Sequence, residues 1–386
     1  MQIFLTVFLG IVASLWIFQA IRAALGMRRM PRLRDVPPLA DPDCPFVSIL
    51  FSARDEEKRL PRALATLLAL DYPRYEIVAV DDRSIDSTGR LLDEAAAHNP
   101  RLKVIHITEL PPGWLGKPHG LRKAYEASSG EWLIFTDADV RFASDLLRRA
   151  LSLARQKNLA YLFLLGRFDA AGFWENTIEA HAGLLLALLE PWQIGNPRSQ
   201  RYGGAGYFQM LARSTYEAIG THRRLAMEVM DDMKLAKLVK RSGTASCVAV
   251  AGERIQVHWM EGLRGSIRNL EKNMFAGCEF RVLVAALAVV AILAADVLPL
   301  AALLFTTGWA RALAGLATVA PMVMVASLAR RFPEMSLSPL FVLTLPLGGL
   351  VLAYMLLNST VKTLRHGGIT WRGTFYRLDD LRKGLV

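Results

Sequence analysis

Long apolar segments at both ends of the chain restrict its possible folds more than any other feature of the sequence. Residues 3–20 contain no charged side chain, and three further apolar segments follow at 282–304, 312–328 and 340–357. A helix of about 20 residues spans the ~30 Å hydrocarbon core of a bilayer, where only helices and closed barrels satisfy their own backbone hydrogen bonds. The sequence therefore predicts transmembrane helices on both sides of a more polar central region.

The composition fits a globular domain combined with membrane segments. Of the 386 residues, 53% are hydrophobic, which is more than a soluble enzyme usually contains, yet 21% are charged, which is more than membrane helices alone would carry. The length allows a domain of ~250 residues together with several spanning helices. The three cysteines are too scattered for a disulfide framework or a metal-binding pair, which favours a reducing compartment.

The first apolar segment is predicted to be an anchor whose N-terminus lies outside the cell. A cleaved signal peptide fits less well, because no basic residue precedes the segment. Instead Arg28, Arg29, Arg32 and Arg34 follow it, and clustered positive residues favour the cytoplasmic side. We therefore expect a multi-pass protein of the cell (inner) membrane with a cytoplasmic central domain.

The excess of positive charge also indicates that the chain lies at a membrane. The chain has a net charge of +11, and basic pairs such as Arg330-Arg331 border the apolar segments. Anionic membrane surfaces attract such clusters. Neither a basic helix nor an aromatic RNA-reading motif occurs in the sequence, so we expect the membrane as a partner and no nucleic acid.

The C-terminal apolar segments leave one question of topology open. The tail from Lys362 onward is basic and is expected to be cytoplasmic, like the central domain. Two parts on the same side of a membrane are joined by an even number of crossings, but three apolar segments lie between them. Either one segment is re-entrant or interfacial, or the tail lies outside; we favour the first alternative.

The central region alternates between apolar strands and amphipathic helices. This alternation predicts an α/β fold with a mostly parallel, Rossmann-like sheet, in which ligands bind at the carboxyl ends of the strands. Strands are expected at residues 46–52, 76–80, 102–106 and 132–136, and helices at 59–70, 87–98 and around 121–127.

The predicted organisation has six consecutive parts. They are an anchor at 1–27, a basic and proline-rich linker at 28–45, the α/β domain at 46–259, an interfacial amphipathic helix at 260–280, a transmembrane region at 281–360 and a basic tail at 361–386.

Two neighbouring acids follow the second predicted strand. Asp81 and Asp82 are well placed there to hydrogen-bond a base or a ribose. The same segment also fits an ordinary turn in which Ser84 or Asp86 caps the next helix, so the motif alone leaves both interpretations open.

A second pair of acids follows the fourth predicted strand, with one residue between them. Asp137 and Asp139 can approach a single hard cation, and Mg²⁺ and Mn²⁺ prefer oxygen ligands and commonly bridge to phosphate oxygens. An Asp-x-Asp motif is common by itself. It becomes more specific behind an apolar strand and after an earlier strand that ends in two acids.

A Gly-Lys pair lies between the two acidic motifs. Gly116 permits close backbone approach, and Lys117 supplies a positive charge suited to a phosphate. A solvated loop lysine is the alternative.

Two more motifs follow at greater distance along the chain. Gly204, Gly206 and Tyr207 belong to a glycine-rich loop that would let the backbone reach a sugar or an acceptor, or would form a simple turn. Asp231 and Asp232 open a predicted helix, where they either stabilise the helix dipole or provide a general base for a hydroxyl proton.

The ordered set of these motifs resembles the family 2 glycosyltransferases of GT-A fold over roughly residues 46–280. Within that family, the segment Pro-Pro-Gly-Trp-Leu-Gly-Lys at 111–117 and the tail segment Trp-Arg-Gly-Thr-Phe-Tyr-Arg at 371–377 look like ceramide glucosyltransferases, hopanoid-associated glycosyltransferases and carotenoid glycosyltransferases. The specificity of the resemblance lies in the order of the motifs rather than in any one of them.

The resemblance implies a role for each acidic motif. Asp81 and Asp82 would hold the nucleoside, Asp137 and Asp139 would act at the diphosphate with Asp139 as the main metal ligand, and the base would be Asp232. The implied reaction is a single displacement with inversion at the anomeric carbon, assisted by Mg²⁺ or Mn²⁺.

The chain departs from the family pattern in one place. Many members carry a Gln/Arg-x-x-Arg-Trp segment after the base, whereas here Arg264, Arg268 and Lys272 form a basic helical stripe beside an apolar one. This pattern is typical of a helix in the membrane interface. Its cations, Arg268 among them, would either clamp the donor diphosphate or contact anionic lipid.

These observations lead to a specific functional hypothesis. We expect a non-processive, inverting transferase that moves a sugar from a nucleotide-diphosphate donor, UDP-sugar being the first candidate, to a hydroxyl of a lipid-type acceptor at the cytoplasmic membrane face. A processive polysaccharide synthase is one alternative, although three or four spans are few for a polymer channel. The other is a membrane scaffold that binds nucleotide without catalysis.

Overall fold

The computed structural model describes residues 2–258 and 261–386. The chain forms two compact units, each assembled from three separate segments. We call the first the helical unit; it comprises Met1–Arg29, Ala170–Pro191 and Trp259–Ile369. We call the second the sheet unit; it comprises Met30–Asp169, Trp192–His258 and Thr370–Val386.

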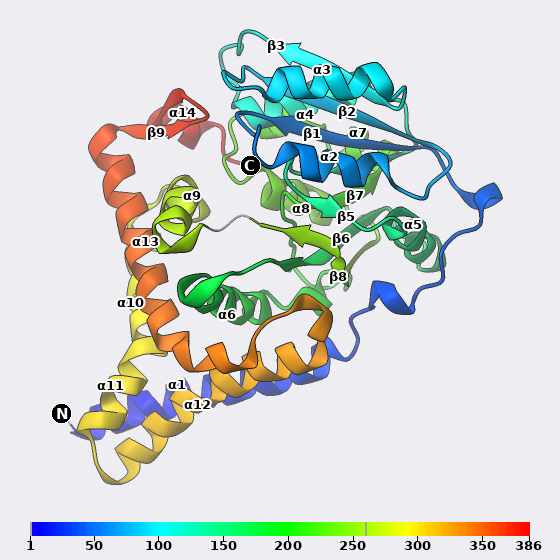
Figure 1. The fold of residues 1–386 in the computed structure, drawn as a ribbon. Helices are drawn as coiled ribbons and strands as arrows, with labels where there is room; N and C mark the ends of the chain where they lie inside the picture. Colours follow the sequence, from blue (N-terminus) through cyan, green and yellow to red (C-terminus); the bar gives the residue numbers. More distant parts are fainter. Residues whose placement is uncertain (1, 259–260) are drawn as a thin grey trace. The chain divides into compact units, whose positions relative to one another are not determined.

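A mixed sheet dominates the sheet unit (Figure 1). Within the described residues it has eight strands in the order β3-β2-β1-β4-β7-β6-β8-β5. The pairs β1–β2, β1–β4, β2–β3 and β6–β8 are parallel, and the pairs that involve β7 or β5 are antiparallel. The strands are β1 (Val47–Ala53), β2 (Tyr75–Asp82), β3 (Leu102–Ile107), β4 (Trp132–Phe135), β5 (Arg141–Phe142), β6 (Tyr161–Phe168), β7 (Gln209–Ala212) and β8 (Ser246–Val257).

Helices connect the strands of the sheet unit. These helices are α2 (Leu60–Leu68), α3 (Thr88–His98), α4 (Gly116–Glu126), α5 (Leu146–Gln156), α7 (Arg213–Ala218) and α8 (Asp231–Arg241). Every residue of β1 and β2 is buried, as expected for parallel strands covered on both faces by helices.

The α/β fold with a mostly parallel sheet is thus confirmed. Each of the four predicted strands begins and ends within two residues of an observed one, and the helices predicted at 59–70 and 87–98 are α2 and α3. The third helix, α4, begins at Gly116, five residues before the predicted segment, and Pro118 occupies its first turn, where proline is tolerated. The sequence analysis did not predict the strands β5 to β8.

The proline-rich segment after the first apolar helix packs against the sheet. The backbone N–H of Val250 in β8 donates to the carbonyl of Pro31 at 2.9 Å, and Arg32 forms an isolated parallel bridge with Val250. Leu33 is fully buried. The segment therefore extends the core of the sheet unit, although its composition resembles a linker.

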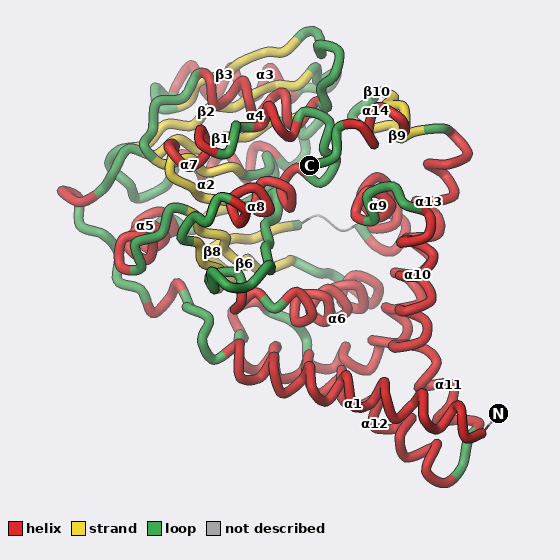
Figure 2. The backbone as a smooth tube through the Cα atoms, turned by 180° about the vertical axis from the view of Figure 1, so that it is seen from behind, coloured by secondary structure: helices red, strands yellow, loops and turns green. Residues whose placement is uncertain are grey.

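The helical unit consists almost entirely of helices (Figure 2). They are α1 (Gln2–Met27), α6 (Gly172–Leu189), α9 (Gly262–Gly277), α10 (Val282–Ile292), a π-helix (Leu293–Val297), α11 (Leu298–Phe305), α12 (Gly308–Arg331) and α13 (Leu345–His366). α1 and α12 lie side by side, and Leu9 packs with Ala310 and Ala314 in a small core. Small residues at such a contact let two helix backbones approach closely.

Four helices among the described residues are long and apolar enough to cross a membrane. They are Gln2–Met27, Val282–Phe305, Gly308–Arg331 and Pro339–His366. These four helices include all of the apolar segments predicted from the sequence. Their exposed surfaces are rich in large apolar side chains, such as Phe4, Leu287 and Trp309.

The amphipathic helix α9 contacts other parts of the helical unit with its apolar stripe. Leu263, Ile267, Leu270 and Met274 pack against a small core that contains Ile178 of α6 and Met355 of α13. Arg264 and Arg268 are exposed. At least part of the apolar surface that the sequence analysis associated with the membrane interface is therefore covered by protein.

The C-terminal tail folds back into the sheet unit. A two-stranded sheet of β9 (Gly368–Trp371) and β10 (Thr374–Arg377) is followed by the short helix α14 (Leu378–Lys383). Residues 370–386 belong to the same compact unit as the strands β1 to β8. The sequence analysis described this segment only as a basic tail.

Candidate active site

The polar motifs meet at one edge of the sheet because the strands that precede them are parallel. Ala53 at the end of β1 pairs with Asp81, and Asp81 pairs with His106 of β3. β4 runs parallel to β1 and ends at Phe135, just before Asp137. The carboxyl ends of the four strands therefore bring residues 53–59, 81–88, 106–117 and 136–139 to the same edge.

Asp81 is held by neighbours within this edge. Its carboxylate accepts a hydrogen bond from the backbone N–H of Ser84 at 3.2 Å and lies 3.0 Å from Nδ1 of His106. Nε2 of His106 lies 2.9 Å from Asp93. Hydrogen bonds to Asp93 and Asp81 raise the pKa of His106, so a charged imidazolium between the two carboxylates is favoured.

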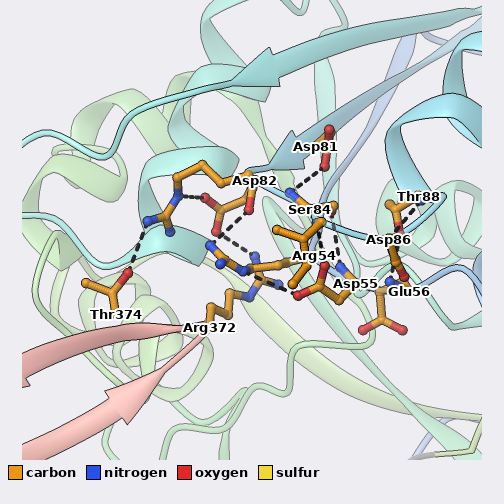
Figure 3. Close-up of polar contacts among 12 residues, drawn as sticks. Arg54, Asp55, Glu56, Asp81, Asp82, Ser84, Asp86, Thr88, Arg372 and Thr374 are labelled. Carbon is orange, nitrogen blue, oxygen red and sulfur yellow. Dashed lines mark hydrogen bonds and ion pairs between the residues drawn. The ribbon is translucent and has the colours of Figure 1, made fainter.

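Asp82 is completely buried and binds two arginines. Oδ1 accepts from Nε of Arg83 at 2.8 Å, and Oδ2 accepts from Nη1 of Arg372 at 3.1 Å. Arg372 also donates to the side chain and the backbone carbonyl of Ser52 in β1. Figure 3 shows Arg372 reaching Asp82 from the C-terminal tail, which is 290 residues away in the sequence. Two cations compensate the cost of burying this carboxylate.

Lys117 connects the Gly-Lys motif to the Asp-x-Asp motif. Its Nζ donates to Oδ1 of Asp137 at 2.5 Å. Burial by itself would lower the pKa of Lys117, but the carboxylates of Asp137, Asp231 and Asp232 outweigh burial and raise it. The four side chains are therefore close enough to share one electrostatic environment, although three separate motifs supply them.

Asp139 lies beside a second carboxylate that the sequence analysis did not select. Burial, followed by the charges of Asp139 and Asp137, raises the pKa of Glu56 to about 7. Burial and then Asp137 likewise raise the pKa of Asp139. Arg59 is 3.4 Å from Asp139. Like-charged neighbours at the end of β4 thus disfavour the charged forms of Glu56 and Asp139.

This acidic group fits a divalent cation only together with other ligands. Carboxylate oxygens are the ligands that Mg²⁺ and Mn²⁺ prefer, and the mutual repulsion of Glu56, Asp137 and Asp139 would be relieved by a cation. Among residues 2–258 and 261–386, however, no three His, Cys, Asp or Glu side chains converge closely enough to hold a metal ion by themselves. A cation at Asp139 would need further oxygen ligands, such as those of a diphosphate.

Asp231 and Asp232 begin α8 and differ in accessibility. Asp231 is 4% exposed and lies 4.0 Å from Nε2 of His222. Asp232 is only half-buried, and its Oδ1 accepts from the backbone N–H of Met233 at 2.7 Å. Of the two acids, Asp232 is the one that a ligand can reach.

The glycine-rich loop packs directly against these acids. A Cβ atom at Gly206 would lie 2.6 Å from Oδ2 of Asp137 and 2.7 Å from Nζ of Lys117. A Cβ atom at Gly204 would lie 2.8 Å from the carbonyl oxygen of Asp232. Both positions therefore require glycine because the loop touches the acidic site.

Comparisons with known proteins agree with this geometry. Residues 48–220 match the model of the family described as "Glycosyl transferase family 2". The chain carries a glycosyl transferase family 2 domain. The matched segment contains all of β1 but its first residue, the strands β2 to β7, the first two acidic motifs, Lys117 and the glycine-rich loop.

Several curated proteins are similar to parts of the chain. The Beta-monoglucosyldiacylglycerol synthase of Synechocystis sp. is 27% identical over 233 residues, which cover 57% of this chain and 47% of that protein. The 4,4'-diaponeurosporenoate glycosyltransferase of Staphylococcus haemolyticus is 34% identical over 115 residues, which cover 29% of each protein. The chain thus spans less than half the length of these relatives.

A solved structure has the same fold. The mannosyltransferase PcManGT from Pyrobaculum calidifontis, in complex with GDP-Man and Mn²⁺, superposes with a TM-score of 0.51 and 21% sequence identity. The superposition covers 92% of this chain and 99% of that one. The likeness supports the GT-A fold of the family 2 domain.

Two of the predicted site residues are buried in the core or belong to the other unit. Tyr207 is 7% exposed, and its ring packs between Phe163 and Phe168 in the core. Arg268 belongs to α9 of the helical unit. Their predicted contacts with the acceptor and the donor stay predictions.

The sheet unit also places four residues at the site that the sequence analysis missed. Glu56 and Arg54 follow β1, and a charged stretch directly after a buried strand is a signal that could have indicated them. Arg83 directly follows the Asp81-Asp82 motif. Arg372 has no such local signal, because only the folded tail brings it to Asp82.

Proposed function

We propose that the chain is an inverting glycosyltransferase that moves a sugar from a nucleotide-diphosphate donor to a hydroxyl of a lipid-type acceptor. One observation carries this proposal. The carboxylates of Asp137, Asp231 and Asp232 all act on Lys117, so the acids of two distant motifs share one site at the edge of a GT-A sheet. A donor diphosphate and an acceptor hydroxyl need this combination of cation-binding and proton-accepting groups.

In this proposal the diphosphate of the donor lies at Lys117, Asp137 and Asp139. When bound, Mg²⁺ or Mn²⁺ supplies Lewis-acid stabilisation of the negative charge on the leaving diphosphate. Lys117 contributes a further positive charge from the α4 end of the site. Asp139 would hold the cation, and Glu56 is a candidate second carboxylate beside it.

Asp232 acts as the general base in the proposed reaction. The acceptor oxygen attacks the anomeric carbon while the bond between that carbon and the diphosphate oxygen breaks. The hydroxyl proton passes to a carboxylate oxygen of Asp232, and the electron pair of the broken bond leaves with the nucleoside diphosphate. Attack from the face opposite the leaving group inverts the anomeric centre.

Two observations support a lipid-type acceptor at a membrane. The names of two relatives, Beta-monoglucosyldiacylglycerol synthase and 4,4'-diaponeurosporenoate glycosyltransferase, refer to sugar transfer onto lipids. The chain itself has four helices suited to cross a membrane. We propose that these helices are embedded in the cell membrane and that the family 2 domain faces the cytoplasm, in agreement with the basic cluster at residues 28–34.

The test offers the full-length protein in detergent a panel of sugar nucleotides with a total membrane lipid extract. Mg²⁺, Mn²⁺ or EDTA is added in parallel, and glycolipid products are measured by mass spectrometry. We expect one donor to give a glycolipid of inverted anomeric configuration in the presence of a cation. No product from any donor with folded protein would contradict the proposal, and a long polymer would favour a processive synthase instead.

A further inference from the structure

A buried histidine that the proposed reaction does not use lies next to the acidic site. His222 is 1% exposed and begins a short 3-10 helix (His222–Leu225) between α7 and α8. This short helix contacts both α4 and α8. The backbone N–H of Leu115, at the start of α4, donates to the carbonyl oxygen of Ala226 at 2.7 Å. The histidine therefore belongs to a segment that joins the Gly-Lys motif to the acidic pair of α8.

The side chain of His222 faces three parts of the site. Its ring packs against Phe135 at the end of β4, with the two ring centroids 4.9 Å apart. Nε2 lies 4.0 Å from Oδ2 of Asp231. Burial, followed by the charge of Lys117, lowers the pKa of His222 to about 3, so the imidazole is neutral. A neutral imidazole has one N–H, and the effect of the ring depends on which nitrogen carries that proton.

Tyr216 of α7 determines which nitrogen this is. The Tyr216 hydroxyl accepts a hydrogen bond from the backbone N–H of His222 at 3.0 Å and lies 2.7 Å from Nδ1 of the same residue. Among the described residues, Nδ1 is the acceptor that the structure gives to the hydroxyl proton. We therefore assign Nδ1 as unprotonated and place the ring proton on Nε2, which faces Asp231.

Asp231 connects this ring proton to the acidic site. Its carboxylate is 4% exposed, and its charge, after that of Asp137, helps to raise the pKa of Lys117. A buried carboxylate is costly unless donors or cations surround it. At 4.0 Å the contact with the Nε2–H is electrostatic, because the distance exceeds that of a hydrogen bond. Asp232 is the next residue in the first turn of α8, so its direction depends on how Asp231 is held.

We propose that Tyr216 and His222 are positioning residues that hold Asp231, and with it the base Asp232, at the acidic site. The Tyr216 hydroxyl fixes the ring, and the Nε2–H of His222 orients the Asp231 carboxylate. The first turn of α8 then presents Asp232 to the acceptor hydroxyl. This inference rests on the proposed function and extends it to His222, which lies just outside the matched residues 48–220.

The test compares His222→Asn with His222→Gln in the full-length protein in detergent, with the donor and lipid that give a product with the wild type. An asparagine carbonyl oxygen can replace Nδ1 as the acceptor for Tyr216 but leaves no N–H towards Asp231. A glutamine side chain can carry an N–H to the place of Nε2. We expect His222→Asn to lower kcat about 10-fold or more and His222→Gln to stay within about threefold of the wild type. The KM for the donor should change less than about threefold in both variants, because His222 does not touch the donor.

A double variant shows whether the effect passes through Asp231. Asp231→Asn by itself should lower kcat, and adding His222→Asn to it should cause less than about a twofold further loss. A further loss as large as that of His222→Asn in the wild type would overturn the inference, because the two side chains would then act independently.

His98→Asn in α3 is the matched control, because His98 is exposed. Thermal unfolding shows whether each variant is folded. If either His222 variant is not, Tyr216→Phe decides, and it should lower kcat about 3- to 10-fold with an unchanged KM for the donor, because the ring proton is no longer fixed on Nε2. An unchanged kcat in that variant would overturn the inference.

Equal kcat values for His222→Asn and His222→Gln would also overturn the inference, because the N–H towards Asp231 would then have no effect. Both results would leave the proposed function intact. A folded wild type that transfers no sugar from any donor would overturn the proposed function and this inference with it.

Discussion

Asp231 and Asp232 are neighbours in the sequence, but the structure gives them different surroundings. Asp231 points into the core towards His222, whereas Asp232 is half-buried at the start of α8. Burial raises the pKa of Tyr161 and Tyr207, and the charge of Asp232 raises both further. The Asp232 carboxylate therefore lies close to two buried tyrosines and to Lys117, where a proton acceptor is useful.

We predict that Asp232→Asn lowers kcat by about 10²- to 10⁴-fold, because the amide retains the size of the side chain but cannot accept a proton. The melting temperature and the affinity for nucleoside diphosphate should change little. Asp35→Asn is the control, since the Asp35 side chain is 66% exposed. Full transferase activity of the Asp232→Asn variant would show that Asp232 is not the general base.

Glu56 gives a prediction about pH. Its pKa is raised to about 7, first by burial and then by Asp139, so the folded chain favours the protonated form. Its contribution to stability is complete below the unfolded pKa of about 4.5 and is lost as the pH rises through about 7. The Glu56→Gln variant does not undergo this loss.

We therefore expect Glu56→Gln to be more stable than the wild type at pH 8, by on the order of 1 to 3 kcal/mol, and about equally stable at pH 5. Thermal unfolding at both pH values, with EDTA present, measures the difference. The exposed Glu94→Gln variant should follow the wild type at both values. If the difference in stability between Glu56→Gln and the wild type were the same at pH 5 and pH 8, Glu56 would not titrate in this range.

At the scale of elements, the helical unit depends on close contacts between helices. Gly348 and Gly349 of α13 pack against His181 of α6 and Asp296 of the π-helix. A Cβ atom at Gly348 would lie 2.9 Å from Cβ of His181, and one at Gly349 would lie 2.9 Å from Cβ of Asp296. Two adjacent glycines thus let three helices meet where two ionisable side chains are buried.

We predict that Gly348→Ala destabilises the helical unit by about 1 to 3 kcal/mol, because the added methyl group meets a buried side chain in a packed interface. Gly315→Ala in α12 is the matched control, since its Cβ atom would be 3.7 Å from Leu303, an ordinary contact. Thermal unfolding of the detergent-solubilised protein measures the stability of both variants. Equal melting temperatures for the two variants would contradict the proposed packing.

At the scale of the whole molecule, the tail restricts the membrane topology. Residues 370–386 belong to the sheet unit, where Arg372 binds Asp82 and the carbonyl oxygen of Val386 accepts from Lys234 and Lys237. If the candidate spans cross a membrane, as we propose, the tail and the family 2 domain lie on the same side of it. In the proposed membrane arrangement, an even number of the three candidate spans between residues 282 and 366 then crosses, and at least one is re-entrant or interfacial.

We predict that a cysteine placed at Arg90 and one placed at Asp379 show the same sidedness in a chain whose native cysteines are replaced. Both positions are exposed. In intact cells both should be protected from a membrane-impermeant thiol reagent, and both should react after permeabilisation. Reaction of Asp379→Cys alone in intact cells would place the tail outside, and reaction of both would reverse the expected orientation.

The sequence by itself determined the features that depend on local pattern. Buried parallel strands read as apolar runs, so β1 to β4 and the motifs at their carboxyl ends were predicted within two residues. The four candidate membrane spans were likewise predicted, because a bilayer requires about 20 consecutive apolar residues. The strands β5 and β7 are short and carry little signal, whereas β6 and β8 contain apolar runs at residues 161–165 and 247–251 that the sequence analysis did not use.

Only the tertiary structure decided which side chains meet. It paired Asp82 with Arg372 across 290 residues, placed Glu56 beside Asp139, and brought His222 next to Asp231. It also covered part of the apolar stripe of α9 with α6 and α13. Contacts of this kind depend on the path of the chain through space, and the spacing of residues in a sequence does not encode that path. From the sequence alone, a charged residue in the tail is expected to lie in solvent. Only the fold shows that Arg372 contacts the buried carboxylate of Asp82.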